Sequence, residues 1–301
     1  MLSSQYESDS APFAACIAAE ALSNQLAELA GADLFQVCIV FSPGKSVFYF
    51  DGDDAVGVGK TVVRAAQKQP AYARKIAKEF NEHAQAHEAF IKSIPGFSQK
   101  DKDSKALSAH ISKFSQERAV LEAYLALCGF SIPALSANSR ACLEAHLKKK
   151  GRDEAVSLML SGKQKKKGTP SQQAEGSAAE QAAAQAQPLP PEQEIPQICA
   201  PLIDALHSLQ KIQTRASALR TDSFAAASPL LAAASAALKL KGNEITWLSA
   251  GEISQALLSG GETRHVVRER GKGCVYSHKE GFGSFYIGEN AKVYAREVIG
   301  Q

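Results

Sequence analysis

The stretch Tyr72–Ile94, YARKIAKEFNEHAQAHEAFIKSI, decides the fold class of this 301-residue chain. Apolar or ring-bearing side chains recur in it every three or four residues: Tyr72, Ile76, Phe80, His83, His87, Phe90 or Ile91, and Ile94. This spacing places them on one face of an α-helix. Pro95-Gly96 ends the pattern. The stretch therefore predicts a long helix with one buried face.

The same spacing predicts further helices along the chain. They are expected over 14–29, from Leu107 to a stop at Gly129 and Pro133, from about Ser139 to Lys150, over 198–219, over 229–240 and over 289–298. Ser249-Ala-Gly-Glu252 is a capping box, which opens another helix that ends at Gly260-Gly261. Several long helices with one apolar face, joined by short loops, are typical of a helical bundle.

Two β-hairpins complete the predicted fold. Phe35–Val40 and Val47–Phe50 are short apolar runs separated by Ser42-Pro43-Gly44-Lys45, a loop of hairpin length. Near the other end, 273–277 and 284–287 flank a turn at Lys279-Glu280-Gly281. The predicted fold class is mainly α: a helical bundle with a short N-terminal β-hairpin and a small C-terminal β-hairpin.

A change of composition divides the chain. From Ser161 to Pro188 no apolar residue is larger than Ala, so this stretch cannot bury enough surface to offset the entropy of ordering it. We expect a hairpin and helical bundle over 1–160, a flexible linker over 161–194, and helices with the second hairpin over 195–301. Mild proteolysis should cut first between Lys163 and Gln187, and the two flanking regions should share one core.

The overall composition is that of a soluble globular protein, with 45% apolar residues and 34 Lys and Arg against 31 Asp and Glu. It excludes a collagen, a fully disordered chain and a small disulfide-stapled scaffold. The first residues lack a basic secretory region and no apolar run approaches membrane-spanning length, so we expect a cytoplasmic protein with no membrane partner. Its six cysteines form no CxxC pair and should be reduced and buried.

The segment Asp51–Thr61 can be compared with two kinds of ligand-binding loop, one for phosphate and one for calcium. Gly59-Lys60-Thr61 resembles the end of a phosphate-binding loop, but Asp54 stands where the first glycine is required. A calcium loop fails at Val56 and Val62, where Gly and Glu are required. We expect the glycines here to make turns after a hairpin, and we expect no cofactor.

The lysine-rich segment around residue 150 is a candidate anion-binding surface. It comprises Lys148, Lys149, Lys150, Arg152, Lys163 and Lys165–Lys167. It has no interleaved aromatic residues on which bases would stack. We therefore expect a solvated helix end and linker, not a nucleic-acid partner.

Two pairs of metal-ligand residues share one helical spacing. His83 and His87 lie four residues apart on the apolar stripe, and Cys142 and His146 repeat that spacing on a later helix. Together they could bind zinc between packed helices and make a metal-stabilised helical binding protein. The alternative, which we favour, is that His83 and His87 are ordinary core histidines facing the bundle interior and that no metal is bound.

Three stretches together resemble a known family. They are 11–20, APFAACIAAE; the strand pair from Cys38 to Asp51 with Gly59-Lys60 after it; and Trp247–Gly260 followed by Arg268–Tyr276 and Tyr286–Lys292. Their order is similar to the helical region that precedes the swivelling phosphohistidine domain of phosphoenolpyruvate-utilising proteins, relatives of phosphoenolpyruvate synthase and pyruvate phosphate dikinase. The resemblance implies a non-catalytic helical module, a docking or scaffold piece for a separate swivelling or phosphotransferase domain.

The same resemblance draws attention to His265. Gly260-Gly261-Glu-Thr-Arg-His265 is similar to the family's phosphohistidine string, with Arg264 in place of a serine. An alternative function is therefore a reduced phosphohistidine carrier. Only 36 residues follow His265, too few for the carrier's β/α core. We thus expect Gly260-Gly261 to end a helix, and His265 not to carry phosphate.

Overall fold

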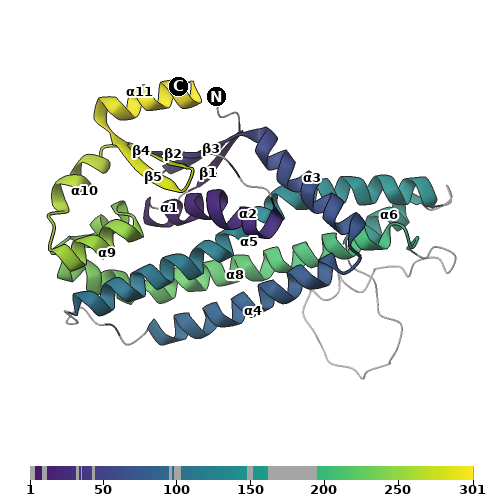
Figure 1. Cartoon of the computed structure of the whole chain (residues 1–301), viewed down its shortest axis with the longest axis horizontal. Coiled ribbons are helices and arrows are strands. Elements are labelled where there is room, and N and C mark those ends of the chain that lie inside the picture. Colours follow the sequence, from purple (N-terminus) through teal and green to yellow (C-terminus); the bar gives the residue numbers. More distant parts are fainter. Residues whose placement is uncertain are drawn as a thin grey trace, which may run out of the picture.

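A small antiparallel sheet lies against a bundle of long helices in this protein (Figure 1). The computed structural model describes residues 4–8, 12–31, 34, 36–42, 45–94, 97, 103–147, 152–161 and 195–300. The mainly helical fold class predicted from the sequence is confirmed.

The part of the chain before residue 162 supplies three strands and most of the bundle. Its elements are β1 (Ser4–Ser8), α1 (Pro12–Glu20), the π-helical turn η1 (Ala21–Gln25), α2 (Leu26–Ala30), β2 (Gln36–Ser42), β3 (Lys45–Phe50), α3 (Gly52–Lys68), α4 (Tyr72–Ser93), α5 (Ser104–His146) and α6 (Arg152–Ser161). The stripe-bearing stretch is therefore one helix, α4, as predicted.

The part after residue 194 supplies one more long helix and the remaining strands. Its elements are α8 (Ala200–Ala237), the 3-10 helix η3 (Gly242–Trp247), α9 (Ala250–Ser259), α10 (Arg264–Arg270), β4 (Cys274–Lys279), β5 (Phe282–Ile287) and α11 (Gly288–Ile299). The predicted linker, apart from Ser161 at the end of α6, lies outside the described residues, and so do Lys148–Lys150 and Lys163–Lys167 of the lysine-rich segment.

The two hairpins join into one sheet, with strand order β1-β3-β2-β4-β5 and every pairing antiparallel. β2 and β4 pair in the middle, with Ile39 opposite Tyr276 and Val37 opposite His278. Both hairpins were predicted, but neither their pairing nor β1 was. Backbone hydrogen bonds between residues some 240 positions apart leave no local pattern in the sequence.

Helices cover both faces of the sheet (Figure 1). On one face Val37, Ile39 and Phe41 contribute to a core shared with α1, α5 and α8. On the other face, Cys38 and Val275 pack against α11. This alternation of neighbouring residues between two apolar layers explains why β2 reads as a nearly continuous apolar run.

Two prolines lie inside helices, at positions where a helix was expected to end (Pro133) or to begin (Pro229). α5 continues through Gly129 and Pro133, so the predicted stop there is wrong and the helix expected from Ser139 is its last part. α8 likewise runs through Pro229 and joins two predicted helices. An interior proline costs about 3 kcal/mol. Burial on both sides of Pro133, where Ser131 and Leu135 are fully buried, offsets this penalty.

The prediction of turns at Gly57 and Gly59 is also wrong, because both glycines lie within α3. The Asp51 side chain caps this helix by accepting a hydrogen bond from the backbone of Asp53 at 2.9 Å. Gly59 faces α5 so closely that an added Cβ would lie 2.7 Å from the Phe130 carbonyl oxygen. This glycine permits two helices to approach and does not cradle a phosphate.

The predicted local signals at the C-terminal end are confirmed. The Ser249 hydroxyl accepts from the backbone N–H of Glu252 at 3.3 Å, and Glu252 accepts from the backbone of Ser249 at 2.9 Å. Gly260 ends α9 with a left-handed φ of 69°. Glu280 and Gly281 both have positive φ and form the two-residue turn of the second hairpin.

One helix is long and apolar enough to cross a membrane by length and composition alone, contrary to the expectation from the sequence. This helix is α5, and half of its most apolar window is buried inside the protein. A mostly buried core helix of a soluble protein has the same length and composition.

Candidate functional site

His265 lies in the first turn of α10 and is exposed. Beside it, Arg264 reaches back to the end of α8, where its guanidinium donates two hydrogen bonds to the Lys239 carbonyl oxygen, at 2.7 and 3.2 Å. Arg264 is therefore engaged with the backbone instead of standing free next to the histidine. The strands and helix that follow α10 complete the sheet and cover it.

An ion pair between buried Arg270 and half-buried Glu252 fixes α10 in place. The Arg270 guanidinium donates to both carboxylate oxygens of Glu252, at 2.7 and 2.5 Å, and to the Trp247 carbonyl at 3.0 Å. It also stacks on the Phe285 ring of β5, 3.4 Å from the ring centre. Burial by itself would raise the pKa of Glu252, but the hydrogen bonds from Arg270 and Ser249 outweigh it and hold that pKa below its usual value.

Two hollows flank Arg264. One of about 430 Å³ lies between the end of α8 and the loop before α10, and includes Lys239, Glu262 and Thr263. The other, of about 450 Å³, lies between η3 and α10 and includes Lys241 and Arg268. Cationic side chains outnumber carboxylates around both, but His265 lines neither hollow.

The four residues of the alternative zinc site do not meet. His87 is buried near Arg118, whereas His83, which was expected to face the interior, is exposed and contacts the Tyr124 ring. Cys142 follows Tyr124 by eighteen residues on α5, which corresponds to about 27 Å of helix axis. The structure therefore does not bring together the alternative ligand set of His83 and His87 with Cys142 and His146.

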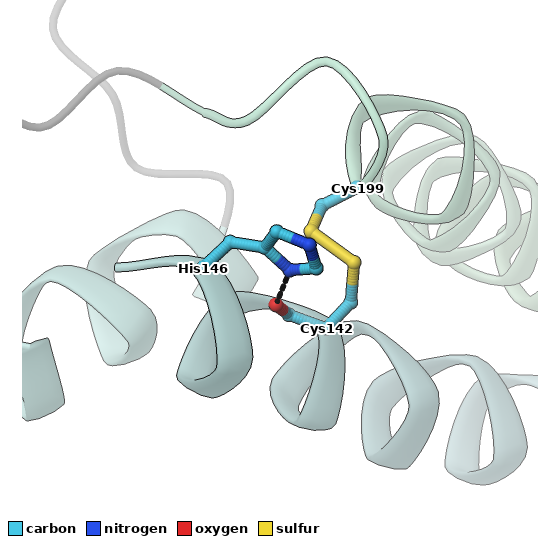
Figure 2. A group of neighbouring side chains, drawn as sticks. All are labelled: Cys142, His146 and Cys199. Carbon is cyan, nitrogen blue, oxygen red and sulfur yellow. Dashed lines mark hydrogen bonds between the residues drawn. A yellow bond between two sulfur atoms is a disulfide. The ribbon is translucent and has the colours of Figure 1, made fainter. Parts of the chain in front are cut away.

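Cys142 instead forms a disulfide with Cys199, which directly precedes α8 (Figure 2). The expectation that all six cysteines are reduced is wrong for this pair, while Cys16, Cys38, Cys128 and Cys274 are free and buried. The pairing spans 57 residues, and the sequence carries no spacing motif from which it could be inferred.

The disulfide lies at a half-buried corner of the bundle. Cys199 is fully buried, Cys142 is partly exposed and His146 is exposed. Apolar side chains of α5, α6 and α8 pack around it, among them Leu143, Met159 and Ile203. Figure 2 shows the His146 ring beside the two sulfur atoms, with Nδ1 turned to the Cys142 carbonyl oxygen, 2.8 Å away.

The outer edge of the sheet beyond β5 is a third candidate site. β5 pairs with β4, and among the residues that the structure describes no strand lies on its other side. Phe282, at its first position, is 79% exposed, and Ile287 at its last position is also exposed. At its second position, Gly283 leaves room for the Tyr276 side chain, because an added Cβ there would lie on the phenol oxygen.

No family model, curated protein or solved structure matches this chain. The resemblance to phosphoenolpyruvate-utilising proteins, and the partner that it implies, therefore stay predictions. What the protein does has to be inferred from the sites themselves.

Proposed function

We propose that this protein is a non-catalytic docking module, which binds an extended segment of a partner protein along the edge of β5. The observation that carries the proposal is the sequence of this edge strand, FGSFYI, which contains no charged residue and no proline. Edge strands of soluble proteins ordinarily carry such residues, because they prevent other strands from pairing there. An unprotected edge is suited to strand addition.

Exposed apolar side chains gather on the same part of the chain. Among the described residues, seven large apolar side chains are exposed, and five of them lie between Leu258 and Val293. Phe282 and Ile287 stand at the two ends of β5, and Val293 lies on α11, which packs against β5. Apolar contacts at both ends of a paired strand would add affinity to the backbone hydrogen bonds.

Side chains of α10 and α11 hold β5 in place, which lowers the conformational entropy that the strand loses on binding. The Phe285 ring stacks under Arg270, and Tyr286 stacks on Tyr294 of α11 with ring centres 3.9 Å apart. The Tyr294 hydroxyl in turn donates to Ser277 of β4 at 2.6 Å. β5 is thus presented as a preformed template.

The placement of the charged groups also supports binding without catalysis. Glu252 pairs with Arg270, and Arg118 pairs with Glu122, so these ion pairs are engaged within the fold. The exposed His265 lines neither hollow beside α10. For the partner, the sequence resemblance suggests a swivelling or phosphotransferase domain, and this stays part of the proposal.

The test is titration calorimetry between the full chain and a purified swivelling domain of a phosphoenolpyruvate-utilising enzyme. We expect one site, and we expect Phe282→Asp to weaken binding at least tenfold, because a carboxylate would then stand at the docking edge. The matched control is Val56→Asp on α3, where the native side chain is 51% exposed and distant in sequence from β5. It should leave binding unchanged.

Equal binding by wild type and Phe282→Asp would contradict docking at β5. Light scattering is run alongside: a dimer of the wild type that Phe282→Asp dissociates would show that the strand pairs with a second copy, against the proposal of a different partner. An acid-labile label from phosphoenolpyruvate that disappears in His265→Ala would replace the docking function with the carrier function.

A further inference from the structure

Cys142, His146 and Cys199 are residue types that bind metal ions, and they lie close together. In this structure the two cysteines are oxidised to a disulfide. One ligand atom from each residue lies within 4.8 Å of the others. The two cysteine Cα atoms are 5.8 Å apart. In a tetrahedral zinc site with Zn–S bonds of about 2.3 Å, two thiolates lie about 3.8 Å apart. Once reduced, the two sulfur atoms would reach that separation by side-chain rotation.

His146 is already oriented as a ligand. The Cys142 carbonyl oxygen can only accept, so Nδ1 of His146 carries the proton and donates to it at 2.8 Å. In this tautomer of the neutral ring, the Nε2 lone pair is available to a metal ion. Metal-ligating histidines ordinarily make such a bond through their second nitrogen, because it sets the tautomer and the ring orientation.

The surroundings suit a metal ion reached from one side. The apolar packing of Leu143, Met159 and Ile203 covers Cys199 from the bundle side. His146 is exposed on the other side, where a fourth ligand such as water would enter. Two thiolates balance the charge of a divalent cation, and thiolate with imidazole is a donor set that zinc accepts.

We propose that the reduced protein binds one Zn²⁺ through the Cys142 and Cys199 thiolates and His146 Nε2, and that oxidation to the disulfide releases it. A dithiol reductant supplies two electrons and two protons to the disulfide and itself becomes a disulfide. Zinc binding then displaces the two thiol protons. In the reverse direction one thiolate attacks hydrogen peroxide, which breaks the O–O bond, releases hydroxide and leaves a sulfenic acid. The second thiolate then attacks that sulfur, so that the S–S bond forms, a second hydroxide leaves and Zn²⁺ is released. The end of α5 stays tied to the start of α8 in both states.

The test is cobalt titration of the full chain after reduction with a phosphine and anaerobic removal of the reductant. We expect one equivalent of Co²⁺ to bind with thiolate-to-metal charge-transfer absorption, and Zn²⁺ to displace it. The untreated, disulfide-bonded protein should bind none. His146→Ala should weaken binding at least tenfold, and Cys142→Ser should remove the charge-transfer band.

The matched control is His110→Ala. The His110 Nδ1 makes the same bond on the same helix, to the Ala106 carbonyl oxygen at 2.9 Å, with no cysteine in the turn. The His110→Ala variant should bind cobalt like the wild type. The proposal is overturned if the reduced wild type binds no cobalt, or if His146→Ala and His110→Ala bind it equally. His146 is exposed, so its replacement tests the site even if Cys142→Ser does not fold.

Discussion

Gly59 decides how closely two helices of the bundle can approach. A methyl group at this position would meet the Phe130 carbonyl oxygen at 2.7 Å and the Ala134 side chain at 3.1 Å. Both belong to α5, next to Pro133. Because backbone cannot rotate away as a side chain can, we expect Gly59→Ala to lower the free energy of unfolding by about 1–3 kcal/mol.

Gly57, two positions earlier on the same helix, provides the control. An added Cβ there meets nothing within 4 Å. Alanine is the better helix former, so Gly57→Ala should raise the free energy of unfolding by about 0.5–1 kcal/mol. Urea unfolding of both variants measures the difference. If both alanines stabilised the protein, the close packing of α3 on α5 would be disproved.

His87 should make stability depend on pH. It is 1% exposed, and among the described residues neither ring nitrogen has a hydrogen-bond partner. Burial, aided by the nearby Arg118 charge and opposed by Glu88, lowers the pKa of His87 from 6.5 to about 4. Between pH 4 and pH 6.5, the unfolded chain therefore binds a proton at this histidine that the folded protein does not bind. The contribution of His87 to the free energy of unfolding is highest above pH 6.5 and decreases as the pH falls towards 4.

Between pH 7 and pH 5 this histidine should account for a loss of about 2 kcal/mol in the free energy of unfolding. We expect His87→Leu to remove that part of the pH dependence. His83→Leu, an exposed position on the same helix, should retain it. Urea unfolding at the two pH values measures the effect, and parallel pH dependences of wild type and His87→Leu would contradict the assignment.

At the scale of elements, the ends of α5 and α8 are joined covalently through Cys142 and Cys199. The disulfide spans 57 residues and includes all of α6. Cross-links over such a loop restrict the unfolded chain and typically stabilise by about 2–4 kcal/mol. We expect the double variant Cys142→Ser, Cys199→Ser to be less stable than the oxidised wild type by this amount.

The reductant supplies the control for that prediction. Adding it in the presence of a chelator should lower the unfolding midpoint of the wild type to that of the double variant, and should leave the double variant unchanged. A wild-type midpoint that does not respond to reductant would mean that the pair does not stabilise the fold.

At the scale of the whole molecule, two distant parts of the sequence form one core. β2 pairs with β4, and α5 packs along α8. Buried Arg118 of α5 donates to the Arg220 carbonyl oxygen of α8 at 2.7 Å and pairs with Glu122 at 2.7 Å. Arg118 thus ties the two parts together through a buried hydrogen bond, in addition to the packing of α5 on α8.

This arrangement predicts that a nicked chain stays assembled. A protease site inserted within residues 162–194 should yield two fragments that elute together under reducing conditions, because the sheet and the α5–α8 contact hold them. The comparison is size-exclusion chromatography of the cut and uncut protein, with urea added to separate the fragments. Fragments that separate without urea would show that the two parts do not share a core.

The sequence by itself determined the elements whose signals are local. The helix α4 and, apart from the exposed His83, its buried stripe were predicted, as were the Ser249–Glu252 capping box, the left-handed Gly260 and the turn at Glu280-Gly281. Each depends on residues within a few positions of one another, so periodicity and turn chemistry suffice to identify them.

Only the tertiary structure decided what depends on distant neighbours. Tertiary packing lets α5 continue past Pro133 and α8 past Pro229, although each proline removes a helical hydrogen bond. The β2–β4 pairing and the meeting of Cys199 with Cys142 and His146 likewise arise from the way the bundle closes. The sequence holds six cysteines and seven histidines, and their spacing along the chain does not tell which of them meet. Three-dimensional packing alone selects which of them, and which strands, lie together.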